Sequence, residues 1–321
     1  MGCQYPPIRV IAGSFYFPPK RFSVMQLIIQ NLNKTYPNGV QALKGVCLTI
    51  SEGMFGLLGP NGAGKSSLMR TIATLQEADS GSIFLDNLDV LKDKEQVRRI
   101  LGYLPQEFGV YPKIDALSLL NHLAVLKGIT DSGERKNLVE SLLHRTNLWG
   151  VRHKNLGGFS GGMKQRFGIA QALLANPKLI VVDEPTAGLD PAERNRFLNL
   201  LSEIGENTIV ILSTHIVEDV KELCTDMAII NKGQVVYSGS PQDAIKDISG
   251  RIWKKRILRS EIEDHRKLYD VLSERLISGN PELKVFSAFL PGAGFEPVEP
   301  DLEDVYFTQI FAKQRVDVPV G

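Results

Sequence analysis

The sequence predicts an α/β protein whose core is a doubly wound parallel sheet. Two segments, residues 179–183 and 208–212, each contain a continuous apolar run (179–182 and 209–212), which is typical of strands buried on both faces. The segment between them, residues 191–204, has a helical pattern and begins with proline, which the first turn of a helix tolerates. A glycine-rich turn at residues 59–67 joins a further strand to a helix. Strands that alternate with helices along the chain favour parallel pairing, with helices on both faces.

The foldable pattern begins at Met25. Residues 27–36 and 46–50 are rich in β-branched side chains and are separated by the turn residues Pro37-Asn38-Gly39. We expect these strands to form an antiparallel β portion that precedes the parallel sheet. Residues 1–24 contain four prolines and no sustained periodicity. We interpret them as an unstructured or non-native upstream segment.

The glycine-rich turn is the most informative segment of the chain. Gly59-Pro60-Asn61-Gly62-Ala63-Gly64-Lys65-Ser66-Ser67 fits G-x-x-x-x-G-K-[ST], between an apolar run and a helical pattern. In that context the glycines let backbone N–H groups converge on phosphate oxygens, and the start of the helix adds partial positive charge. Lys65 can then reach the β- and γ-phosphates, and the Ser66 hydroxyl can ligate Mg²⁺. The segment therefore predicts a nucleotide phosphate site.

The middle of the chain predicts an inserted helical subdomain at about residues 107–162. Strand patterns at 81–85 and 100–106 precede it, and residues 115–128 and 133–146 carry apolar side chains at helical spacing. Gln106 ends the second strand, where its amide can sense the metal or the γ-phosphate. On the residues alone, an ordinary polar loop residue is an equally good interpretation.

Two carboxylates, Asp183 and Glu184, end the apolar strand that begins at residue 179. At this edge of a parallel sheet Asp183 is placed to hold Mg²⁺, directly or through water, and Glu184 to orient and deprotonate a water molecule. Solvated loop acids are the alternative, and the phosphate loop upstream favours the catalytic interpretation. His215 follows the next core strand, where a neutral imidazole can hydrogen-bond the γ-phosphate and the water.

A second glycine-rich turn, residues 157–162, opens a helix predicted over residues 163–175. Backbone N–H groups at such a start bind anions, so Ser160-Gly161-Gly162 can serve a nucleotide held by another copy of the chain. A helix-capping turn is the alternative interpretation.

Composition narrows the range of partners. A formal net charge of +1 shows no basic excess of the kind that marks a bulk nucleic-acid binder. No run approaches the roughly 18 apolar residues that span a bilayer, so we do not expect the chain to cross a membrane. The cysteines and histidines show no metal-ligand spacing.

After residue 240 we expect a small α+β appendix (residues 241–321), with strands at 252–258 and 283–289 and helices at 266–276 and 302–312.

Together these motifs resemble the ATP-binding cassette (ABC) ATPase subunits over about residues 26–240, so the fold implied is a P-loop NTPase of ABC type. The corresponding motifs are Gly59 to Ser67 (Walker A), Tyr36 (stacking on adenine), Gln106 (Q-loop), Phe159-Ser160-Gly161-Gly162-Met163 (the signature, usually LSGGQ), Asp183 and Glu184 (Walker B and catalytic glutamate), Ala187-Gly188-Leu189-Asp190 (D-loop) and His215 (switch histidine).

Two positions of the signature depart from the family pattern. Phe159 stands where the family has Leu, and Met163, which cannot donate a hydrogen bond from its side chain, stands where it has Gln. Met163 followed by Lys164-Gln165-Arg166 looks most like ATPases of the ABC-2 type exporter group, and residues 302–306 look like their C-terminal ends.

The resemblance implies a Mg²⁺-dependent ATPase that powers a membrane transporter. Two copies, identical or paralogous, would close head to tail around ATP, with each ATP between Lys65 of one chain and Ser160 of the other. Ser66, Gln106 and Asp183 would hold Mg²⁺. A multi-spanning membrane subunit would dock on residues 107–127, which include Phe108 and Tyr111, so the chain would be cytoplasmic and peripheral on the inner face of the cell membrane.

Three alternatives remain on the sequence alone. A soluble ABC ATPase acting on ribosomes or DNA is disfavoured, because the chain has one cassette and no long heptad tract. A non-catalytic regulator is disfavoured by the presence of Glu184 and His215. An importer ATPase is separated only weakly from an exporter. The transported substrate cannot be read, because its contacts belong to the membrane subunit.

Overall fold

A computed structural model describes residues 25–311 apart from 107–108, 110, 187 and 206–207, so the predicted upstream segment 1–24 lies outside the described residues. The chain divides into two compact units. Within the described residues, the first consists of residues 25–54, 62–213 and 232–234, and the second of residues 55–61, 214–231 and 235–311.

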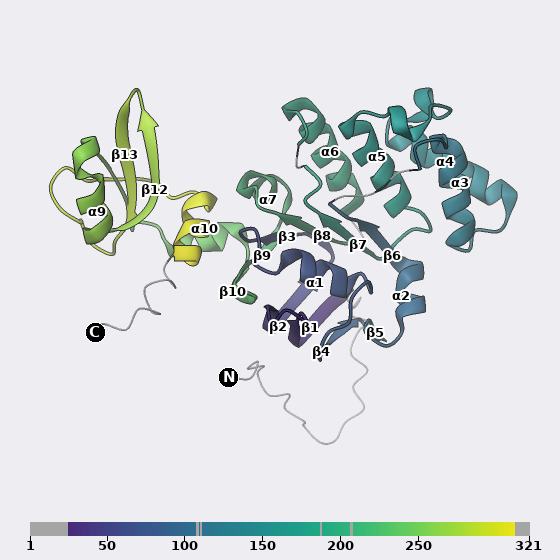
Figure 1. The fold of residues 1–321 in the computed structure, drawn as a ribbon, viewed down its shortest axis with the longest axis horizontal. Coiled ribbons are helices and arrows are strands. Elements are labelled where there is room, and N and C mark those ends of the chain that lie inside the picture. The colour runs from purple at the N-terminus through teal and green to yellow at the C-terminus, as the bar shows by residue number, and fades with distance from the viewer. Residues whose placement is uncertain (1–24, 107–108, 110, 187, 206–207, 312–321) are drawn as a thin grey trace, which may run out of the picture. The chain divides into compact units, whose positions relative to one another are not determined.

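The first unit opens with an antiparallel sheet of strand order β2-β1-β4-β5 (Figure 1). Its strands are β1 (Gln26–Thr35), β2 (Gln41–Ser51), β4 (Ser80–Leu85) and β5 (Leu88–Asp89). Leu27 pairs with Ile50 on one side and with Leu85 on the other, and all three side chains are buried. Alternation along β1 therefore puts one face in the core, and the predicted antiparallel β portion is confirmed.

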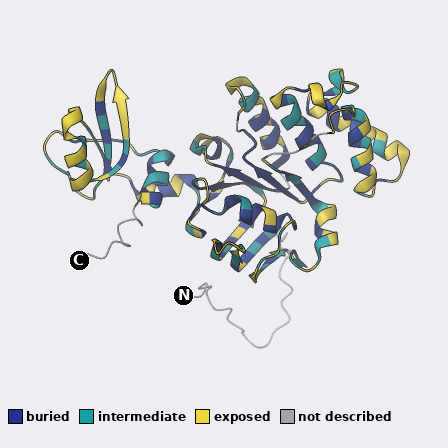
Figure 2. Cartoon of the chain, in the orientation of Figure 1, coloured by how far each residue is buried: buried dark blue, intermediate teal, exposed yellow. Residues whose placement is uncertain are grey.

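Parallel strands follow in the same unit. β6 (Leu101–Leu104), β7 (Leu179–Asp183) and β8 (Ile209–Thr214) are neighbours in that order, with Gly102 opposite Ile180 and Ile180 opposite Val210. Every residue of β7 and β8 is buried, as the dark ribbons of Figure 2 show. The continuous apolar pattern of these segments thus confirms the predicted parallel core.

Several helices of the first unit begin at a residue whose side chain caps the helix. Besides α1 (Lys65–Ile72) and α2 (Lys94–Ile100), the unit contains α3 (Ala116–Leu126), α4 (Ser132–Arg145), α5 (Gly161–Ala172) and α6 (Pro191–Ile204). Asp115, Asp131, Ser160 and Asp190 each accept a hydrogen bond from the backbone N–H three residues later. Such caps satisfy one of the orphan donors at a helix start. Helices α3, α4 and α5 pack on one another.

In the second unit β3 (Gly53–Leu58) runs parallel to β9 (Asp226–Asn231), and β10 (Gln234–Gly239) follows β9. Helix α7 (Val217–Leu223) approaches β3 so closely that a Cβ on Gly56 would lie 2.7 Å from Val220 Cγ1. Only glycine fits there without displacing the helix. Helix α8 (Pro241–Asp247) leads into the appendix.

The appendix is a small antiparallel sheet with two helices. Strands β11 (Ile252–Arg256), β12 (Asp270–Ile277), β13 (Asn280–Phe286) and β14 (Glu296–Pro297) have the order β12-β13-β11-β14. Helix α9 (Ile262–Leu268) precedes β12, and α10 (Leu302–Phe311) follows β14.

One expectation for the appendix, a helix over residues 266–276, is wrong. The helix ends at Leu268, and β12 begins at Asp270. Ser278 and Gly279 have φ values of 50° and 85°, so they make a tight turn that folds β12 back on β13. Strand pairing across this hairpin has overridden the helical pattern. Throughout the described part of the chain, including the appendix, no helix has the length and apolar character needed to span a membrane.

Candidate active site

The phosphate loop connects β3, which ends at Leu58, to α1, which begins at Lys65. Gly64 caps the helix with φ 110°, a left-handed value that side-chain-bearing residues rarely adopt. A Cβ at Gly64 would also clash with the backbone oxygen of Ala42 in β2. Both the backbone angle and the close approach therefore require glycine, and they fix the point from which the Lys65 side chain leaves the loop.

Lys65 and Glu184, predicted from separate motifs, meet in a buried ion pair. Lys65 Nζ lies 3.3 Å from Glu184 Oε1, and the two side chains are 5% and 6% exposed. Glu184 has φ 51°, a strained left-handed value for a residue with a side chain, and its N–H donates to Ser213 O at 2.9 Å. The end of β7 thus holds the carboxylate where it neutralises the lysine.

Asp183, the last residue of β7, has the character of a cation ligand. Its side chain is 3% exposed, and its Oδ1 has no hydrogen-bond partner in the described structure. Ser213 lies opposite it in the strand ladder, and the buried Ser213 Oγ has no partner either. Carboxylate and hydroxyl oxygens suit Mg²⁺, and an orphaned buried carboxylate oxygen is costly unless a ligand satisfies it. The residues present therefore fit a magnesium ion.

Ser213 was not among the predicted site residues. The signal was present in the sequence, since two small polar residues, Ser213 and Thr214, end an otherwise apolar strand.

Tyr103 in β6 was also not among the predicted site residues. Burial, and secondarily the negative charge of Asp183, raise the pKa of the Tyr103 phenol, while the positive charge of Arg70, followed by a hydrogen bond with it, acts in the opposite direction. This ring therefore lies within the electrostatic field of the proposed cation site.

Tyr36, predicted to stack on adenine, is tied to helix α1. Its hydroxyl donates to Gln76 Oε1 at 2.8 Å and lies 2.9 Å from Ser67 Oγ. The hydroxyl of Ser67 thus contacts Tyr36 from the first turn of α1, and the two contacts orient the Tyr36 ring. Gln106 follows β6 and is exposed, and the residues just after it, 107–108, lie outside the described structure.

The signature residues form the start of α5. Ser160 is exposed, and its Oγ accepts from Met163 N at 3.3 Å, so the helix-capping interpretation holds for this side chain. Phe159 is 5% exposed, which explains why an apolar residue suits this position. The Met163 side chain takes no part in the cap, because its backbone supplies the donor. Capping by Ser160 Oγ and anion binding by the neighbouring backbone N–H groups are compatible.

The same turn meets the helix that follows the D-loop. A Cβ on Gly162 would lie 2.5 Å from Glu193 Oε2 in α6, so glycine makes room for this carboxylate. Glu193 N donates to Asp190 Oδ1 at 2.9 Å, and Arg166 Nη2 lies 3.7 Å from Glu193 Oε2. Glu193 therefore connects the signature turn to Asp190, a link that sequence reasoning missed. Ala187, at the other end of the D-loop, lies outside the described residues.

His215 belongs to the second unit and lies between Thr214 and Ile216, which are joined by a hydrogen bond. Thr214 Oγ1 donates to Asp219 Oδ2 at 3.2 Å and accepts from Ile216 N at 2.9 Å, and neither Thr214 nor Asp219 is exposed. Thr214 and Ile216 are the neighbours of His215 in the chain, and His215 itself is exposed. His215 also lines a cavity of about 330 Å³ whose walls come from α7 and α10.

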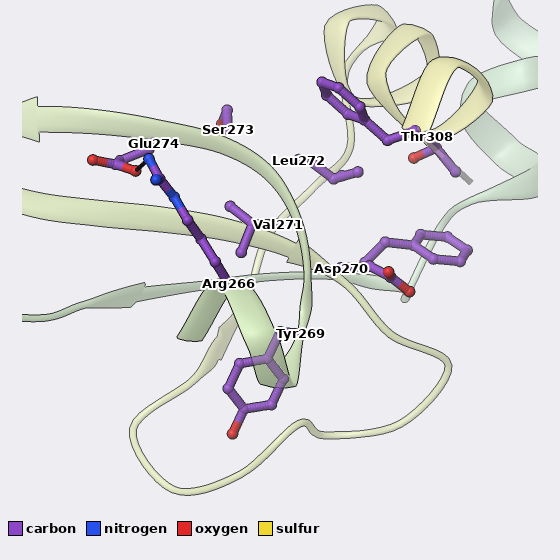
Figure 3. Close-up of a pocket in the computed structure, with 10 residues that line it drawn as sticks. Arg266, Tyr269, Asp270, Val271, Leu272, Ser273, Glu274 and Thr308 are labelled. Atoms are coloured by element: carbon purple, nitrogen blue, oxygen red, sulfur yellow. Dashed lines mark hydrogen bonds and ion pairs between the residues drawn. The ribbon is translucent and has the colours of Figure 1, made fainter. Parts of the chain in front are cut away.

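A separate cavity of about 360 Å³ lies in the appendix (Figure 3). Its lining comes from α9, β12, β13 and α10, and it includes Arg266, Thr308 and Phe311. Figure 3 shows the Arg266 side chain extended along Glu274, to which Nη2 donates at 2.7 Å. None of the predicted site residues lines this cavity.

Comparison with known proteins gives a consistent assignment. Residues 43–187 match the family model described as ABC transporter. The chain is 34% identical over 245 residues to the probable multidrug ABC transporter ATP-binding protein YbhF of Escherichia coli (strain K12), covering 75% of this chain and 42% of that protein. It therefore spans less than half of the length of YbhF.

Shorter relatives match over more of their length. The ABC transporter ATP-binding protein YxlF of Bacillus subtilis (strain 168), which is uncharacterized, is 36% identical over 218 residues, 68% of this chain and 72% of that protein. Among solved structures, the dimeric ATP-binding cassette MJ0796 in a post-hydrolysis state with ADP and Pi has a TM-score of 0.61 and 28% identity, covering 67% of this chain and 98% of that one. The chain belongs to the ABC transporter family, among its ATP-binding proteins.

Proposed function

We propose that this protein binds and hydrolyses ATP with Mg²⁺ and that this reaction powers a membrane transporter, with residues 25–240 as the nucleotide-binding domain. The buried Lys65–Glu184 pair beside the unpartnered Asp183 carboxylate oxygen is the observation that carries the proposal. It supplies a cation for phosphate, a carboxylate base and an oxygen ligand for Mg²⁺ in one place.

ATP binding and preparation for catalysis are coupled through this pair. For Lys65 to contact the β- and γ-phosphates, its ammonium group must exchange the Glu184 carboxylate for phosphate oxygens. The exchange releases Glu184 to orient and deprotonate a water molecule, with His215 as a further hydrogen-bond partner of the γ-phosphate. Ser66, Asp183 and Gln106 would hold Mg²⁺, which when bound would supply positive charge to the phosphates. Tyr36 would supply the surface for adenine.

Head-to-tail dimerisation would complete the site. Ser160 and Gly161 are exposed at the N-terminus of α5, where backbone N–H groups can receive the γ-phosphate of ATP bound to a second chain. The MJ0796 cassette, which this chain resembles, is dimeric in its structure. The second chain would be another copy or a paralogue.

We infer that a helix of the multi-spanning membrane subunit docks on a groove of about 360 Å³ in the first unit. The groove includes Leu75 and Leu126, which are 61% and 70% exposed, together with Tyr103 and Leu123. Lys127 Nζ donates to Arg98 O and Leu101 O at 2.8 and 2.7 Å, so it is held against the groove wall, and burial lowers its pKa. An apolar groove of this kind fits the apolar face of a helix.

Similarity to proteins named for multidrug transport and linearmycin resistance favours an exporter. The protein would then lie in the cytoplasm, peripheral on the inner face of the cell membrane.

Tyr111, which is exposed, is a further residue that we expect to contact the membrane subunit. Phe108 lies outside the described residues.

Purification of the Glu184→Gln protein with ATP from detergent-solubilised native membranes, followed by mass spectrometry, tests the proposal. We expect a multi-spanning protein in about a one-to-one ratio, lost when ATP is omitted or when Lys65→Ala is added. Ribosomal proteins or nucleic acid without a membrane protein would instead favour the soluble alternative. Purified protein that hydrolyses no ATP, with or without the membrane subunit, would contradict the proposed activity itself.

A further inference from the structure

We propose that the appendix, through helix α10, positions the loop between β8 and α7 that carries His215 (residues 215–216, the His215 loop). Tyr306 is the positioning residue. This inference rests on the proposed function, because it concerns the histidine assigned to ATP hydrolysis. It gives residues 252–311 a role that the chemistry of the ATP site does not itself require.

The first observation is a shared cavity. His215 lines it together with Val217, Glu218 and Lys221 of α7 on one side. Leu302, Glu303, Tyr306 and Phe307 of α10, with Asp301 just before them, line the other side. The loop that carries His215 and the start of α10 therefore border the same space, and both belong to the second unit.

The second observation is that α10 packs against β9 and is bonded to β13. Asn231 Nδ2 at the end of β9 donates to Ile310 O at 3.5 Å, and Val305 and Ile310 are buried. On the appendix side, Lys284 Nζ in β13 donates to both carboxylate oxygens of Asp304 at 3.0 Å. Since Asp304 is 2% exposed, this bond compensates a buried charge and resists displacement.

The N-terminus of α10 is fixed in the same way. Asp304 N donates to Asp301 Oδ1 at 2.9 Å, and Asp301 N donates to Asp304 Oδ2 at 3.1 Å. The reciprocal bonds set the direction in which α10 leaves the appendix sheet. The backbone that carries Tyr306 is therefore tied at its start to the appendix sheet.

The backbone beside His215 is tied by the Thr214 hydroxyl, which accepts from Ile216 N and donates to the Asp219 carboxylate. The imidazole itself is exposed. A ring that closes one side of the cavity reduces the rotamers open to the imidazole, so less conformational entropy is lost when His215 engages a ligand. The half-buried Tyr306 provides this wall.

The test is a double-mutant cycle on ATP hydrolysis with the full chain and its membrane subunit. We expect Tyr306→Ala to lower kcat about tenfold and to leave KM for ATP within about twofold, because misplacement of a catalytic group acts on turnover. Tyr306→Phe should retain most of the activity. Gln309→Ala, on the same helix but outside the cavity, should behave as wild type.

In the His215→Ala background, Tyr306→Ala should cause no further loss, since a residue that acts through His215 has nothing left to position. A multiplicative loss in that background, or an unchanged kcat for Tyr306→Ala, would overturn the inference while leaving the role of His215 intact. A His215→Ala variant with wild-type turnover would overturn the proposed role of His215 first.

A structural readout accompanies the kinetics. In protein labelled with ¹³C at the histidine rings, the His215 signal is identified by its absence from His215→Ala. Tyr306→Ala should shift this signal and leave those of His122 and His144, which lie in the first unit, in place. An unshifted His215 signal would contradict the proposed contact, and a shift of all histidine signals would indicate misfolding and overturn the positioning role.

Discussion

Replacing Glu184 by Gln removes one charge from the buried pair with almost no change in shape. At 3.3 Å and an effective dielectric constant of about 20, the attraction between Lys65 and Glu184 is roughly 5 kcal/mol before desolvation is subtracted. Breaking a buried pair by removing one partner costs about 3–5 kcal/mol, because the remaining charge stays buried. The glutamine oxygen can still accept from Lys65, so we expect a loss near the lower figure, about 3 kcal/mol.

The phosphates of ATP restore a negative partner for Lys65. The variant should therefore be destabilised when nucleotide is absent and should gain more stability than wild type when nucleotide binds. A difference of about 3 kcal/mol corresponds to roughly a hundredfold tighter binding of nucleotide, since each factor of ten is about 1.4 kcal/mol. Both effects share one cause, the loss of the carboxylate that competes with phosphate for the lysine.

Urea unfolding of both proteins, with and without a non-hydrolysable ATP analogue and Mg²⁺, measures this difference directly. The analogue removes hydrolysis as a confounding variable. Glu203→Gln, which neutralises an exposed acid of α6, is the matched control and should follow wild type. An equal gain in unfolding free energy on nucleotide binding by wild type and Glu184→Gln would refute the claim that Glu184 competes for Lys65.

Three further predictions concern single groups. Gly64→Ala should abolish ATP binding, measured by calorimetry, because alanine strains the left-handed backbone and strikes a neighbouring carbonyl. Thr214→Val should lower the kcat of ATP hydrolysis several-fold, because Ile216 N loses its acceptor, and Thr214→Ser should restore it. Burial, followed by the charge of Asp219, raises the pKa of the Cys224 thiol from 9.0 to about 12, so it should resist iodoacetamide at pH 9 until urea unfolds the protein. Because the folded pKa is the higher one, this thiol contributes stability below pH 9 that is lost as pH rises towards 12, and Cys224→Ala should remove that alkaline loss.

The phosphate loop and the apolar strands could be predicted because their signals are local. A few neighbouring residues are enough to predict the roles of the loop glycines, of Lys65 and of the apolar run before Asp183. The meeting of Lys65 with Glu184 also follows from general rules, since Glu184 follows the end of one core strand and the loop before Lys65 begins at the end of another.

One missed feature is local: the turn at Ser278 and Gly279 pairs a segment with a helical pattern with the neighbouring strand β13. The other missed features depend on non-local contacts. Glu193 reaches Gly162 only because α5 and α6 pack side by side. Hydrophobic periodicity does not predict that Tyr306 and His215 line the same cavity, since about ninety residues separate the two in the chain.

The return of α10 to β9 also constrains how this protein folds during synthesis. Asn231 and Ile310, which are hydrogen-bonded, are 79 residues apart in the chain. At 5–20 residues per second, a ribosome needs roughly 4 to 16 s to synthesise that interval. Throughout it, the surfaces of β9 and α7 that α10 will cover remain open to solvent or to other nascent chains. The second unit is therefore completed late, and we expect chaperone dependence and aggregation during expression to respond to substitutions in α10 more than to substitutions in the phosphate loop.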